Sequence, residues 1–93
     1  MYSVERIKDS MRISHDKLND QIGSDIESCL SDLSLYGIAT QDNEGTALDD
    51  PLIDKAVELY CKAQSDYQGA ARRYTQLYQQ LVAGMQASED YRK

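Results

Sequence analysis

Few side chains in this sequence are of the types that carry out chemistry, and their spacing does not group them. His15 is the only histidine, and it has no cysteine or carboxylate at the spacing that metal ligands use. Cys29 and Cys61 lie on two different predicted helices and form no CxxC pair. We therefore predict a solvated or locally hydrogen-bonded His15, two buried free thiols, and no metal or cofactor.

Two groups of acidic residues could be mistaken for sites. The run 42–45 looks faintly like a calcium loop, but its spacing does not supply the alternating oxygen ligands of an EF-hand. In the group Asp49, Asp50 and Asp54, we interpret Asp50 as a helix N-cap and Asp54 as a solvent-facing residue of the first turn. There is also no phosphate-binding glycine loop, and no nucleophile is paired locally with the histidine. We predict that the protein is not an enzyme.

Composition predicts a single helical domain spanning residues 1–93. The chain has one proline and five glycines, and its net charge is −6. A protein that reads nucleic acid needs basic patches to neutralise phosphates, and this chain has the opposite balance. No apolar run reaches membrane-spanning length, and the first residues lack the apolar core of a signal peptide. We therefore expect no membrane contact and a cytosol-like compartment.

Apolar residues recur at helical spacing and predict an all-α bundle of about four helices. A short first helix is capped by Ser3. A second is capped by Ser14 and ends at Gly37, which places Ile38 against Leu33 as in a Schellman motif. The apolar faces of these two helices are formed by Val4, Ile7, Met11, Leu18, Ile22, Ile26, Cys29, Leu30, Leu33 and Tyr36.

The third helix has the widest apolar face, so we predict that it is the centre of the fold. Asp50 caps it and Pro51 takes its first position. The preceding loop, residues 39–50, is long for so small a domain, which favours contact with a partner. A fourth helix restarts near Ala70, and the tail 86–93 is predicted to be mobile. The residues expected to be among the least exposed are Ile53, Ala56, Val57 and Tyr60.

The run DPLIDKAVELYCKAQSDY, residues 50–67, resembles the helical signature of the small phage head–tail connector proteins, also called head-completion adaptors or DNA-packaging connector proteins. In that family an acidic residue and a proline lead into a helix of the form xxAxxLYxKAxxxY, and a tyrosine-bearing last helix follows. The run 12–22 is similar to the start of the family's second helix, and 88–92 to its polar ending. Residues 64–66 depart from the pattern. The matching residues are Asp50, Pro51, Leu52, Ile53, Ala56, Leu59, Tyr60, Lys62, Ala63 and Tyr67.

This resemblance implies a structural virion protein of the head–tail interface, assembled in the host cytoplasm. Such proteins form a ring, usually of twelve copies, under the portal protein, and they offer a platform to the next head-closure or tail protein. DNA passes through the ring without sequence-specific binding, and an acidic conduit suits that passage because it repels phosphates.

A closed ring needs two different complementary surfaces on each copy. The acidic side of the second helix and the start of the fourth helix are the predicted surfaces, and the loop and the tail reach outward. Tyrosine suits surfaces that are buried on assembly, and the chain has seven. The candidate interface residues are Asp20, Glu27, Asp42, Glu44, Arg72, Arg73, Tyr74, Asp90, Tyr91 and Arg92.

Two other functions are alternatives. A helix-turn-helix regulator would use the second helix for recognition, but its exposed face carries serine and acid rather than the Arg, Lys, Asn or Gln that contact bases. An acidic inhibitor or DNA mimic would gather carboxylates on one face. We expect the acidic residues here to be spread over every helix and interleaved with Lys and Arg.

Overall fold

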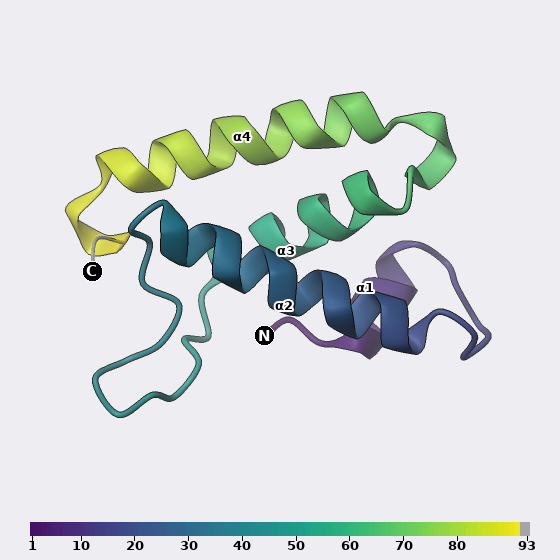
Figure 1. The fold of residues 1–93 in the computed structure, drawn as a ribbon, viewed down its shortest axis with the longest axis horizontal. Helices are drawn as coiled ribbons and strands as arrows, with labels where there is room; N and C mark the ends of the chain where they lie inside the picture. The colour runs from purple at the N-terminus through teal and green to yellow at the C-terminus, as the bar shows by residue number, and fades with distance from the viewer. Residues whose placement is uncertain (92–93) are drawn as a thin grey trace.

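The structure is a computed structural model that describes residues 1–91, and it is an all-α fold as predicted (Figure 1). Its helices are α1 (Val4–Ser10), α2 (Asn19–Leu35), α3 (Pro51–Gln64) and α4 (Ala71–Ala87). Two short 3-10 turns follow the last two helices, η1 (Tyr67–Gly69) and η2 (Glu89–Tyr91). The molecule measures 37 × 28 × 18 Å, and α3 contacts each of the other three helices. The predicted long loop lies between α2 and α3.

The predicted N-caps of α1 and α3 are confirmed. The Ser3 hydroxyl accepts a hydrogen bond from the backbone N–H of Arg6 at 3.1 Å. The Asp50 carboxylate accepts from the backbone N–H groups of Leu52 and Ile53, at 2.8 and 3.4 Å. These bonds satisfy N–H groups that have no partner inside the helix, which is why the two side chains define where the helices begin.

The predicted end of α2 is confirmed as well. Gly37 has a φ of 79°, in the left-handed region that favours glycine, and the backbone N–H of Ile38 donates to the Leu33 carbonyl at 3.0 Å. Leu33 and Ile38 are both buried, which completes a Schellman motif. Gly69 also has a positive φ, 68°, and α4 restarts at Ala71, next to the predicted position.

The predicted start of α2 is wrong. Ser14 does not cap the helix, which begins only at Asn19 with no side-chain hydrogen bond at its cap. In the longer connection from α1, Arg12 adopts a left-handed φ of 57°, and the side chain of Asp16 is bound by Lys8. The Nζ atom of Lys8 lies 2.7 Å from the Asp16 carboxylate, and this hydrogen bond raises the pKa of the lysine. A capping rule that uses only neighbouring residues does not include such a contact.

The prediction that α3 is central is confirmed. Ile53, Ala56 and Val57 are fully buried in a core that all four helices share. Tyr60 is only half-buried, in contrast to the prediction, because one side of its ring lines an open hollow beside α2, while its ring also packs edge-on against Tyr78 with centroids 5.3 Å apart. The core consists of Ile7, Met11, Ile22, Ile26, Cys29, Leu33, Ile38, Ile53, Ala56, Val57, Leu59, Cys61, Tyr78, Val82 and Met85.

The loop 39–50 folds back on itself. Gln41 and Ala47 form an isolated antiparallel bridge, and the Asp42 carboxylate accepts hydrogen bonds from the backbone N–H groups of Glu44 and Thr46 at 2.9 and 3.0 Å. Asp42 therefore serves as a turn residue, as an Asx turn requires. No helix within residues 1–91 is long and apolar enough to cross a membrane.

Candidate subunit interface

The structure distributes the predicted interface residues over three surfaces rather than bringing them together. Asp20 and Glu27 lie on α2, the arginines and Tyr74 on α4, and the others on the loop or the tail. Tyr74 and Tyr91 are half-buried, and Arg92 lies outside the described residues. The exposed members are Asp20, Glu27, Asp42, Glu44, Arg72, Arg73 and Asp90.

One of these surfaces is the outer face of α2. The helix carries acidic residues and no lysine or arginine, and within residues 1–91 neither Asp20 nor Glu27 has an ion-pair partner. At the end of this face the Leu35 side chain is 87% exposed. The outer face surrounds an open hollow of about 420 Å³, lined by Ser24, Glu27, Ser28, Ser31, Asp32, Leu35 and Tyr60.

A second surface, the outer face of α4, has the opposite charge. Arg72 and Arg73 are exposed, no acidic residue occurs between Ala71 and Ala87, and neither arginine has an ion-pair partner among the described residues. Leu77, one turn after Arg73, is 36% exposed. The expectation that acidic and basic residues are interleaved on every helix is therefore wrong for α2 and α4, because each of these helices carries charge of one sign only.

A partly buried hydrogen bond joins the two charged helices. The Tyr78 hydroxyl of α4 donates to the Asp32 carboxylate of α2 at 2.7 Å, and the Cys29 sulfur lies 3.9 Å from the same hydroxyl. Burial raises the pKa of Tyr78, so the hydroxyl stays protonated and remains a donor. Asp32 was not among the residues predicted to have a role. In the sequence, its position three residues after Cys29, at the edge of the predicted apolar face, was the one indication that Asp32 faces a neighbouring helix.

The two tyrosines on either side of the α3–α4 turn form a cage for a lysine of their own chain. The Lys62 ammonium lies 5.3 Å from the centre of the Tyr67 ring and 5.6 Å from that of Tyr74. It also approaches the Glu58 carboxylate at 3.7 Å. Such cation–π contacts stabilise the turn that orients the first residues of α4. Tyr74, predicted as an interface residue, thus has a partner within the subunit.

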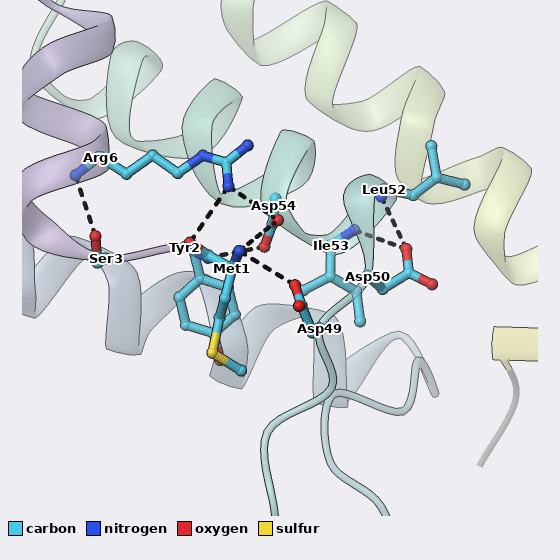
Figure 2. Close-up of polar contacts among 9 residues, drawn as sticks. All are labelled: Met1, Tyr2, Ser3, Arg6, Asp49, Asp50, Leu52, Ile53 and Asp54. Carbon is cyan, nitrogen blue, oxygen red and sulfur yellow. Dashed lines mark hydrogen bonds and ion pairs between the residues drawn. The ribbon is translucent and has the colours of Figure 1, made fainter.

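Asp54, predicted to face solvent, is buried and joins the N-terminal segment to α3 (Figure 2). Its carboxylate accepts a hydrogen bond from the backbone N–H of Tyr2 at 2.8 Å and pairs with the Met1 ammonium at 3.3 Å and Arg6 at 3.5 Å. The ammonium also lies 3.1 Å from Asp49, and the hydrogen bonds with Asp49 and Asp54 raise its pKa. The prediction failed because helical position alone does not show that the chain returns to this carboxylate.

Tyr91 connects the tail to both ends of the long loop. Its carbonyl accepts a hydrogen bond from the backbone N–H of Ala39 at 2.8 Å, and its hydroxyl donates to the Asp50 carboxylate, with both carboxylate oxygens at 3.0 Å. The loop and η2 therefore form one unit beside the C-terminal end of α2 (Figure 1). Asp42 and Asp90 project from this unit. Their mobility in a lone subunit stays a prediction.

The residues with potential for chemistry are dispersed in the structure. His15 is exposed, and its Nδ1 accepts a hydrogen bond from the backbone N–H of Lys17 at 3.3 Å, the local bond that was predicted. Cys29 and Cys61 are buried and free, as predicted, and burial raises the pKa of both thiols to about 12. Within the described part of the chain, no three His, Cys, Asp or Glu side chains converge where they could hold a metal ion.

No protein-family model, curated protein sequence or solved structure matches this chain. The distribution of charge and apolar side chains over its surface is therefore the main guide to function.

Proposed function

We propose that the protein is a structural virion subunit, a head–tail connector that forms a ring under the phage portal. The ring extends the DNA channel and offers a platform to the next connector or tail protein. The observation that carries this proposal is the separation of charge between two helices. The outer face of α2 bears unpaired Asp20 and Glu27, while that of α4 bears unpaired Arg72 and Arg73.

Two different complementary surfaces on one subunit favour a head-to-tail assembly, because each copy can use one surface toward each neighbour. Such heterologous contacts close into a ring when the rotation between copies divides a full turn. Exposed charges steer and register partners more than they bind them. Affinity must therefore come from the exposed apolar side chains on the same faces, among which Leu35 and Leu77 stand out.

The charge balance also suits a channel for double-stranded DNA. The net charge is −6, and the unit formed by the loop and the tail presents Asp42, Glu44, Glu89 and Asp90 to solvent. Carboxylates that line a conduit repel phosphates, so DNA slides through without being held. In this proposal the subunit is not a catalyst, its partners are further copies, the portal and a head-closure or tail protein, and its location is the virion.

One observation favours a second candidate, an acidic inhibitor that docks on a basic partner. The outer face of α2 has carboxylates and no cation, as an acidic mimic requires. An inhibitor of this kind acts as a monomer, whereas a connector assembles. The helix-turn-helix alternative receives no such support, because the same acidic face would have to approach DNA phosphates.

The two candidates are separated by measuring mass in solution. Sedimentation at increasing concentration, alone and with the portal protein encoded in the same genome, should show self-association and co-migration with the portal. Electron microscopy of that mixture should show an added ring. If the protein stays monomeric, does not bind the portal and binds basic proteins, the acidic-inhibitor function is correct and the connector function is wrong. Deleting residues 86–93 should leave the helices folded and weaken assembly on the portal, although it also removes the last two residues of α4 and the contacts of Tyr91 with the loop.

A further inference from the structure

We infer that the contact between neighbouring copies is made by α4 of one subunit docking lengthwise on the outer face of α2 of the next, with Arg73 against Glu27 and Leu77 in the hollow beside Leu35. This inference rests on the proposed function for its biological role and names the surface through which its ring would form. The occupant of the α2 hollow is thus a second copy of this chain.

The charge of the α2 hollow favours the outer face of α4 as its occupant. The hollow contains the carboxylates of Glu27 and Asp32 and no cation, and Asp32 is already engaged by Tyr78. Glu27 is exposed without an ion-pair partner within residues 1–91. The outer face of α4 supplies the matching cation, Arg73, which equally lacks a partner in the described chain. Like-charged surfaces would repel, so this pairing is the favourable one of the three possible between these faces.

The spacing of the side chains matches when the two helices run parallel. Glu27, Ser31 and Leu35 follow one another at intervals of four residues, as do Arg73 and Leu77. With a rise of about 1.5 Å per residue, placing Arg73 beside Glu27 brings Leu77 opposite Ser31, about 6 Å further along both helices. Small serine side chains leave room there for a leucine, and Leu35 covers its far side.

The direction of the helices within one subunit agrees with this arrangement. In Figure 1 both α2 and α4 run from the right of the view to the left. Copies related by a small rotation keep their helices nearly aligned, so α4 of one copy then runs parallel to α2 of its neighbour. Because the two faces belong to different helices, a subunit can use both of them at once, as a ring requires.

Charge reversal tests the contact. Glu27→Lys and Arg73→Glu should each raise the concentration for half-maximal self-association at least about tenfold, since like charges then face each other. A 1:1 mixture of the two variants should recover wild-type association, because each contact in an alternating ring again joins opposite charges. Asp9→Lys and Lys17→Glu are matched controls, exposed residues outside both faces with the same charge changes. Each should associate as the wild type does.

An apolar variant provides an independent readout. Leu77→Ser should weaken self-association by a similar factor while lowering the melting temperature of the monomer by only about 5 °C, because Leu77 is 36% exposed in the subunit and is not part of its core. Single reversals that associate normally, a mixture that does not recover, or a wild type that stays monomeric up to about 1 mM would each overturn the contact. If the reversals behave as expected and the portal is not bound, the contact stands and the proposed function fails.

Discussion

The hydrogen bond between Tyr78 and Asp32 should make a measurable contribution to stability. Tyr78→Phe removes only the hydroxyl, which donates to the carboxylate at 2.7 Å, and keeps the ring against Tyr60. A hydrogen bond to a charged group contributes about 1.5–3 kcal/mol. Asp32 is half-buried, so water can replace the lost donor in part, and we expect the lower end, about 1.5–2 kcal/mol.

For a domain of this size, a loss of 1 kcal/mol lowers the melting temperature by roughly 4–8 °C, so Tyr78→Phe should melt about 10 °C below the wild type. Urea unfolding followed by circular dichroism measures the free energy directly, and an unchanged slope would show that the same surface is exposed on unfolding. The control is Tyr36→Phe, which alters the 46% exposed tyrosine at the C-cap of α2 and should stay within about 0.5 kcal/mol of the wild type.

A double-mutant cycle that combines Tyr78→Phe with Asp32→Ala measures the interaction energy between these two side chains. The two single variants should each be destabilised, and the double variant should lose clearly less than their sum, with a coupling energy of at least about 1 kcal/mol. A coupling near zero, or a Tyr78→Phe variant as stable as the wild type, would refute the account of how α2 and α4 are held together.

Other variants test the remaining contacts. Val57→Asp should abolish the helical circular dichroism signal, because it buries an unpaired carboxylate at a fully buried position at a cost of several kcal/mol. Asp54→Ala should cost about 2 kcal/mol and speed hydrogen exchange in α1, and unchanged exchange would contradict its role in holding the N-terminal segment. Tyr91→Phe should cost about 1 kcal/mol and speed exchange at the ends of the loop 39–50, while the centre of α3 stays protected. Burial raises the thiol pKa of Cys29 and Cys61 from 9.0 to about 12, so the unfolded chain loses these protons first. The free energy of unfolding should therefore fall as pH rises from 9 toward 12, by at most about 1.4 kcal/mol per pH unit for each thiol, and more gently in Cys→Ala variants.

Several features followed from the sequence alone because their causes are local. The caps at Ser3 and Asp50 and the left-handed end at Gly37 each depend on residues within five positions along the chain. The central place of α3 followed from the width of its apolar face, since a helix that is apolar over so wide an arc must be covered on several sides.

The separation of charge between α2 and α4, which defines the candidate interface, could be predicted only in part from the sequence. Every charged residue was visible in the sequence, but the pattern emerged only once the ends of α2 and α4 were known. Asp16 and Lys17 precede α2, and Glu89 and Asp90 follow α4, so a difference of a few residues at the helix ends decides whether each helix carries one sign of charge.

The contacts that sequence reasoning missed join residues far apart in the chain. Asp54 and the backbone of Tyr2 are 52 positions apart, and Asp32 and Tyr78 are 46 apart. No periodicity or capping rule relates such positions, because the approach of two side chains depends on how whole helices pack. By itself, the sequence determined the helices, their main ends and the identity of the central one. Only the tertiary structure decided which carboxylates are engaged within the subunit and which remain free for a partner.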